Sequence, residues 1–179
     1  MALARKLERN CLLPAACKNF MSLLVPNPLS INGAPFTFGV VAARYNDVLV
    51  EGLLEVVLAQ LGAAGVKAKR LTVLRVPGSH EVPWAVQALA AQRGCDCVIA
   101  LGVLIAGDTN HHEMVGQSVS HALQQIALTT GTPIINGVIV ANNLKQARAR
   151  CLGAINRGAE FAAAGLEVAA LKRSLGKKL

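Results

Sequence analysis

Aromatic residues are scarce in this chain of 179 residues, where one Trp, one Tyr and four Phe make up 3% of the sequence. Ala, Val, Leu and Gly are abundant instead, and 53% of the residues are apolar. Small apolar side chains in this proportion favour closely packed helices and strands over an all-β fold. The length and the apolar content suit one domain with its own core.

Long hydrophobic runs are also missing, since no stretch approaches the roughly 18 apolar residues of a membrane helix. Arg5-Lys6 precedes a short apolar segment, but Pro14 interrupts that segment and a secretion signal is not expected. The five cysteines are odd in number and irregular in spacing, which speaks against a disulfide framework or a zinc site. We therefore expect a cytoplasmic protein with reduced thiols and no membrane contact.

Acidic residues are nearly absent from the two ends, and this accounts for most of the formal charge of +8. Residues 1–30 contain four basic residues and one acid, and residues 172–179 contain four basic residues and no acid. Removing these eight basic residues and one acid leaves ten basic and nine acidic residues in the body. Because no basic stripe is interleaved with aromatics, nucleic acid is not expected as a partner.

The apolar periodicity alternates between that of strands and that of helices. It predicts strands over 36–42, 71–76, 98–105 and 133–140, and helices over 50–61, 82–93, 111–130, 144–151 and 157–175. Strands that are apolar on both faces predict a parallel sheet with helices on both sides. Residues 1–33 are interpreted as an extension ending in a linker, 34–175 as the domain and 176–179 as a basic tail.

Polar turns follow the first three predicted strands, at Arg44-Tyr45-Asn46, at 77–81 and at 107–111. Ligands of parallel sheets bind beyond the carboxyl ends of the strands. We therefore expect the three turns to form one site.

The third turn carries the strongest chemical signal. Gly107-Asp108-Thr109 leads into a helix, where backbone N–H groups and the helix dipole attract an anion, provided that the Asp108 carboxylate points away. The alternative is an ordinary turn with Thr109 or Asn110 as helix cap. His111 and His112 follow, and the dipole favours the neutral imidazole, which accepts a proton. Neighbours on a helix point about 100° apart, so one of them at most faces the crevice.

Other candidates also have two interpretations. Tyr45 can stack on a planar ring or fill the edge of the core, and Glu81 can bind hydroxyl groups or favour a helix start. His80 and His121 are interpreted as surface or structural residues, and no histidine pair has the spacing of a metal site. Arginine is a preferred phosphate partner, but on a helix it is commonly solvated. The candidates in the last quarter of the chain are Arg148, Arg150 and Arg157.

Four segments, in their order and spacing, resemble the 6,7-dimethyl-8-ribityllumazine synthase family: 38–46, 76–83, 100–115 and 137–140. The resemblance extends from about Phe36 to Leu171. It implies a flavodoxin-like three-layer sandwich, with a four-stranded parallel sheet and helices on both faces. It also implies a homopentamer with active sites between subunits, in many members a shell of sixty subunits, and riboflavin synthase as a partner.

The reaction implied by the resemblance is the penultimate step of riboflavin biosynthesis. 5-Amino-6-(D-ribitylamino)uracil condenses with 3,4-dihydroxy-2-butanone 4-phosphate to give 6,7-dimethyl-8-(D-ribityl)lumazine, phosphate and water, with no cofactor or metal. The alternatives are an inactive shell-forming or flavin-binding paralogue and an unrelated flavodoxin-like binding module. His111 and the glycine turn favour the active transferase.

The resemblance also assigns residues to roles, with proton transfer assigned to His111. The residues expected to contact the pyrimidine and the ribityl chain are Tyr45, Asn46, Ser79, His80, Glu81, Val103, Leu104, Ile105 and Asn136. Those expected to bind the phosphate are Gly107, Asp108, Thr109 and Arg150. Arg157 and Glu160 match charged residues near the site.

The chain departs from the family pattern at three places. Asn136 replaces a phenylalanine that, in many members, reaches the neighbouring subunit's site, so stacking there is lost or replaced by a hydrogen bond. Residues 151–156 form a turn that is about one residue shorter than usual. This leaves open whether Arg148 or Arg150 binds the phosphate. It also leaves open whether the shell forms, because this turn shapes the contacts between pentamers. Residues 1–33 have no clear counterpart. None of these three departures affects His111, and His112 beside it stands where an aromatic is common in the family.

Overall fold

Four parallel strands form one sheet in the order β2-β1-β3-β4. The computed structural model describes residues 29–91, 94–153 and 155–176. Its strands are β1 (Phe38–Ala43), β2 (Leu71–Val76), β3 (Cys97–Ile105) and β4 (Ile134–Ala141). Because all four run the same way, their carboxyl ends share one edge of the molecule.

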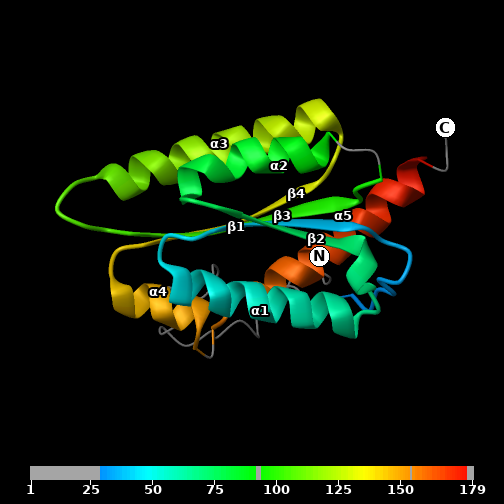
Figure 1. Cartoon of the computed structure of the whole chain (residues 1–179), viewed down its shortest axis with the longest axis horizontal. Coiled ribbons are helices and arrows are strands. Elements are labelled where there is room, and N and C mark those ends of the chain that lie inside the picture. Colours follow the sequence, from blue (N-terminus) through cyan, green and yellow to red (C-terminus); the bar gives the residue numbers. More distant parts are fainter. Residues whose placement is uncertain (1–28, 92–93, 154, 177–179) are drawn as a thin grey trace, which may run out of the picture.

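Five α-helices cover the two faces of this sheet: α1 (Asp47–Ala63), α2 (Val82–Ala90), α3 (His111–Thr130), α4 (Leu144–Cys151) and α5 (Gly158–Gly176). Two short 3-10 turns, η1 (Ala68–Arg70) and η2 (Ser79–Glu81), flank β2. Figure 1 shows α2 and α3 on one face of the sheet and α1, α4 and α5 on the other. The predicted flavodoxin-like three-layer sandwich is confirmed.

The two middle strands are buried on both faces, as the apolar runs predicted. Alternate residues of a strand point to opposite faces, so Val40 and Ile99 pack in the core under α1 and α5. Val41 and Val98 pack in the core under α2 and α3. The two cores hold the helices in fixed positions relative to the strand ends.

Strand β2 departs from the expectation that every strand is covered on both faces. Its residues Thr72 and Val73 are exposed. The physical reason is its position at the edge of the sheet, next to β1 alone.

The predicted ends of the strands and helices lie at or near the observed ends in most cases. The strand over 71–76 and the helix over 144–151 match at both ends. Gly131, with φ 64°, ends α3, and the Asn143 side chain caps α4 by accepting a hydrogen bond from the Gln146 N–H at 2.9 Å. Helix α2 ends at Ala90, earlier than predicted, and residues 92–93 lie outside the described ranges.

The last residues of the predicted extension contact the body of the protein. The Gly33 N–H donates to the Ala64 carbonyl at 2.7 Å, and the Leu29 N–H donates to Glu167 Oε1 at 3.3 Å. The division at residues 33 and 175 remains a prediction, since 1–28 and 177–179 lie outside the described residues. Among the helices that are described, none is long and apolar enough to cross a membrane.

Candidate active site

Hydrogen bonds tie the turn after β1 to the ends of β2 and β3 at the carboxyl edge of the sheet. The Arg44 N–H donates to the Val76 carbonyl at 2.8 Å, and the Tyr45 N–H donates to the Pro77 carbonyl at 3.1 Å. Both bonds tie the turn after β1 to the end of β2. Asn46 Nδ2 donates to the Val103 carbonyl of β3 at 2.8 Å. The carboxyl ends of β1, β2 and β3 thus lie together at one edge, and that the three turns form one site stays a prediction.

The turn after β1 directs Tyr45 outward. Asn46 has φ 56°, in the left-handed region that Asn tolerates better than most residues, and it precedes the first turn of α1. The Tyr45 side chain is 75% exposed. It does not fill the edge of the core, and its stacking on a planar ring stays a prediction.

The turn after β2 brings a buried hydroxyl to the same edge. Ser79 is only 5% exposed, and its Oγ has no hydrogen-bond partner among the residues the structure describes. Glu81 Oε2 accepts from the Gly78 N–H at 2.8 Å, so this carboxylate does favour the helix start, while its residue stays exposed. His80 is also exposed. Buried polar atoms are normally paired, so the Ser79 Oγ is free to bond a ligand or a water.

Gly102 allows Ser79 to take this position, and the sequence interpretation did not assign it that role. A Cβ on Gly102 would lie 2.5 Å from Ser79 Oγ and 3.2 Å from Ser79 Cβ. Glycine inside a strand commonly marks such a close approach. Because Gly102 lies inside the apolar run of 98–105, the sequence already contained this signal.

The connection between β3 and α3 extends beyond the end of the sheet (Figure 1), and its residues 107–110 are exposed. Asn110 occupies the cap position of α3 without a side-chain hydrogen bond. The backbone nitrogen of His111 lies 3.5 Å from Thr109 Oγ1, which is too far for more than a weak hydrogen bond. The first N–H groups of α3 thus lack a strong cap, which suits an anion.

The two histidines at the start of α3 have different environments, as their angular spacing predicted. His111 is exposed. The His112 side chain is 11% exposed, and its Nδ1 is buried with no partner in the described part of the chain. Of the two imidazoles, His111 is the one that a substrate in solution can reach.

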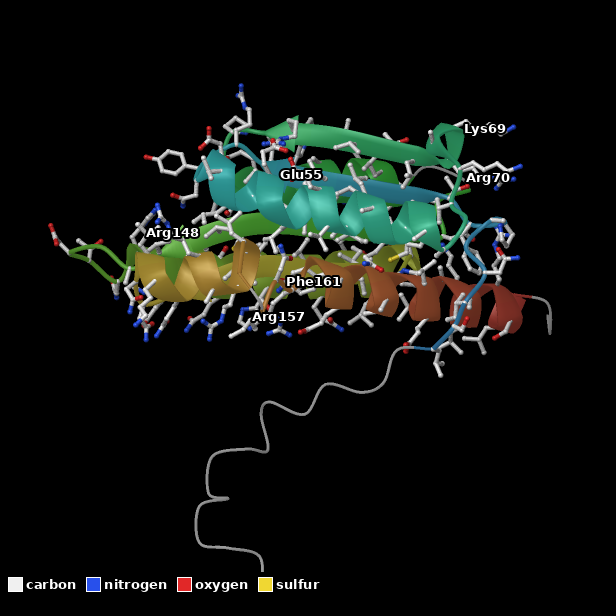
Figure 2. All side chains as sticks on the ribbon, turned by 90° about the horizontal axis from the view of Figure 1, so that it is seen from below. Glu55, Lys69, Arg70, Arg148, Arg157 and Phe161 are labelled. Atoms are coloured by element: carbon white, nitrogen blue, oxygen red, sulfur yellow. The ribbon has the colours of Figure 1, made fainter. Side chains whose placement is uncertain are left out.

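The candidate arginines belong to the opposite helix layer. Arg150 Nη1 donates to the Gln146 carbonyl of its own helix at 3.2 Å, and Arg157 pairs with Glu160 at 2.8 Å and lies 5.8 Å from the centre of the Phe161 ring. Figure 2 shows Arg148 near the end of the molecule where the β3–α3 connection extends, and Arg157 nearer the middle. No hydrogen bond between described residues joins these arginines to residues 107–109.

Asn136 lies away from the carboxyl edge within one chain. It is exposed near the start of β4, opposite Ala100, and its Oδ1 accepts from the Val138 N–H at 3.1 Å. Ala141 ends the strand five residues later, about 16 Å further along at the usual rise. One chain does not bring Asn136 to Tyr45.

The described cysteines do not form a nucleophilic or metal-binding centre. Burial raises the pKa of Cys95 and Cys97, and it raises that of Cys151 to about 11 although Arg150 opposes the shift. These thiols stay protonated near neutral pH. Cys11 and Cys17 lie outside the described residues. Within the described ranges, no three His, Cys, Asp or Glu side chains gather closely enough to hold a metal ion.

Comparison with known proteins agrees with this geometry. Residues 35–173 match the family model described as 6,7-dimethyl-8-ribityllumazine synthase. The chain belongs to this family. Its similarity to the 6,7-dimethyl-8-ribityllumazine synthase of Pyrococcus furiosus is 41% identity over 145 residues, which cover 81% of this chain and 90% of the relative. The enzyme of the same name from Nitrosospira multiformis is 38% identical over 152 residues, covering 85% and 91%. Membership of the lumazine synthase family confirms the resemblance drawn from the four segments.

Proposed function

We propose that this chain is a transferase that condenses 5-amino-6-(D-ribitylamino)uracil with 3,4-dihydroxy-2-butanone 4-phosphate. The products are 6,7-dimethyl-8-(D-ribityl)lumazine, phosphate and water. Membership of the lumazine synthase family supports the reaction. The observation that carries the proposal is the exposed His111 at the weakly capped start of α3, directly after the Gly107-Asp108-Thr109 turn.

The pyrimidine substrate binds where the first three strands end. Its ring stacks on Tyr45, and the backbone of Val103-Leu104-Ile105 and the Asn46 amide hydrogen-bond its polar edge. The ribityl chain lies along residues 79–81. One of its hydroxyl groups provides the partner that the buried Ser79 Oγ lacks.

The phosphate of the second substrate binds at the start of α3, on the backbone of residues 107–109 and the Thr109 hydroxyl. The Asp108 side chain is exposed and can point away from it. His111 then transfers protons in three stages. The amine and the ketone form an imine with loss of water, phosphate leaves by elimination, and the second amine closes the ring with loss of another water.

The remaining site residues come from a neighbouring copy in a homopentamer. Asn136 lies away from the carboxyl edge of its own chain, and no hydrogen bond between described residues joins Arg150, Arg157 or Glu160 to residues 107–109, which supports this part of the proposal. The face of α2 and α3 also exposes the large side chains of Trp84, Met114 and Leu128, and exposed apolar surface of this kind marks interfaces. A sixty-subunit shell, riboflavin synthase as a partner and a cytoplasmic location follow from the family as further proposals.

The experiment compares the rate of lumazine formation, followed by absorbance, with the rate of the uncatalysed condensation. We expect His111→Ala to lower the catalysed rate by about 10²-fold, the low end for general acid–base catalysis. His121→Ala is the matched control, because His121 is an exposed histidine of the same helix. A wild-type rate equal to the uncatalysed rate would refute the proposed function.

A further inference from the structure

Arg75 and Glu51 form a largely exposed ion pair beside the turn that carries Tyr45. Arg75 lies on the edge strand β2, opposite Ala42 of β1. Its Nη1 donates to the Glu51 carboxylate of α1, and its Nη2 donates to the Ala43 carbonyl at 3.3 Å. The two side chains are 29% and 45% exposed. One guanidinium thus connects an edge strand, a helix and the last residue of β1.

The position of the Tyr45 ring depends on this backbone. Ala43 ends β1 and is followed directly by Arg44-Tyr45-Asn46. The Tyr45 side chain is 75% exposed, so little packing restrains it. The turn is held to the end of β2 by the N–H groups of Arg44 and Tyr45. Arg75 adds a side-chain hydrogen bond to the same pair of strands, one residue before the turn.

We propose that the Arg75–Glu51 pair is a positioning device for Tyr45 and, through it, for the pyrimidine substrate. The inference rests on the proposed function, in which that ring stacks on Tyr45. Arginine suits the task because its planar fork can bond a carboxylate and a carbonyl at once, whereas one lysine ammonium holds such a geometry less well. Exposed ion pairs contribute little to global stability, so loss of the pair should affect the site more than the fold.

The variants are Arg75→Ala, Arg75→Lys and Glu51→Gln, with Arg70→Ala as the matched control. Arg70 Nη1 donates to the Pro35 carbonyl at 2.9 Å and lies 3.4 Å from Thr37 Oγ1. It is likewise an arginine that bonds backbone next to β1 and β2, but at the opposite end of the molecule from Arg148 and the β3–α3 connection (Figure 2). Its loss should leave the substrate constants unchanged.

The measurement is the steady-state rate with each substrate varied in turn, together with the thermal midpoint of every variant. We expect Arg75→Ala to raise the KM for the pyrimidine substrate by roughly tenfold, because a small misplacement of a binding group is costly. The KM for the phosphate substrate and kcat should change less than about twofold. Arg75→Lys and Glu51→Gln should fall between the wild type and Arg75→Ala.

Two outcomes would overturn the positioning role, and a third would refute the proposed function itself. An active wild type whose pyrimidine KM is the same in Arg75→Ala and Arg70→Ala would overturn the positioning role. So would equal rises in both KM values that follow a fall in the thermal midpoint, since these indicate a role in folding alone. A wild type without activity above background would instead refute the reaction itself.

Discussion

The two ends of the sheet differ in how their polar groups are paired. At the amino end, the Asp96 carboxylate is buried and accepts from the Thr37 N–H, Arg173 Nε and Arg173 Nη2, each at 2.7 Å. Lys172 Nζ donates to the Cys95 carbonyl at 2.8 Å and to Thr132 Oγ1 at 3.0 Å. At the carboxyl end, Ser79 Oγ and His112 Nδ1 are buried without partners among the described residues.

This difference suggests that one end of the sheet serves stability and the other end serves function. A network whose buried donors and acceptors are paired holds the ends of strands and helices in place and leaves no buried group for a ligand to bond. Buried atoms without partners cost stability and are expected where a ligand supplies the missing bonds. We interpret the amino end as the structural anchor and the carboxyl end as the site.

The largest expected effect comes from closing the space between β3 and the turn after β2. In Gly102→Ala the new Cβ would lie 2.5 Å from Ser79 Oγ, so the turn must move away from β3. We expect activity to fall by about 10²-fold and the free energy of unfolding to fall by about 1–3 kcal/mol. Steady-state kinetics and denaturant unfolding measure the two effects.

Ala100→Gly, at a buried position of the same strand, is the control for a small volume change that does not face Ser79. If Gly102→Ala were fully active, the present position of Ser79 would not be required for activity.

Asp96→Ala should lower stability but, unlike Gly102→Ala, leave activity unchanged. It leaves Arg173 and the Thr37 N–H without their acceptor, which costs about 1.5–3 kcal/mol for bonds to a charged group. Glu55→Ala, an exposed acid of α1 (Figure 2), is the control and should change stability by less than about 0.5 kcal/mol. A loss of activity in folded Asp96→Ala would contradict the division between the two ends.

Replacing the arginines of α4 tests which of them binds the phosphate in the proposed site between subunits. We expect Arg150→Ala to raise the KM for the phosphate substrate by about tenfold, the loss of one charge-assisted bond, with the KM for the pyrimidine unchanged. Arg148→Ala is its counterpart from the same helix and should have the smaller effect. The reverse order would assign the phosphate to Arg148.

The smallest expected effect is on the way the free energy of unfolding depends on pH. Burial alone raises the pKa of Asp96, but the hydrogen bonds from Arg173 and the Thr37 N–H outweigh it, so the net pKa is lowered. A lowered folded-state pKa stabilises the protein above the unfolded value of about 3.9. That contribution is lost as the pH falls through the folded pKa. Asp96→Asn should therefore show a flatter loss of unfolding free energy below about pH 4 than the wild type, and parallel curves would rule out this linkage.

Local patterns were enough to predict the elements and the edge at which the site lies. The apolar runs predicted β1 and β3 because these strands are buried on both faces. The exposure of β2 was not predicted, because it depends on the order of strands and not on the sequence of that strand.

Contacts between distant residues could not be predicted in the same way. The bonds from Asn46 to Val103, from Arg75 to Glu51 and from Arg173 to Asp96 join residues that come together only when the layers pack. The place of Asn136, far from the carboxyl edge of its own chain, follows from the register of β4 on β3. The roles of the site residues remain predictions that ligand binding has to test.

Hydrogen exchange, read by mass spectrometry with and without 5-amino-6-(D-ribitylamino)uracil, tests the division between the two ends most directly. Amides that a ligand covers or orders exchange more slowly. We predict slower exchange over residues 43–46, 78–82 and 103–112, and unchanged exchange over 35–37, 95–98 and 131–134. Protection confined to the segments around Asp96, with none at the carboxyl edge, would contradict the account.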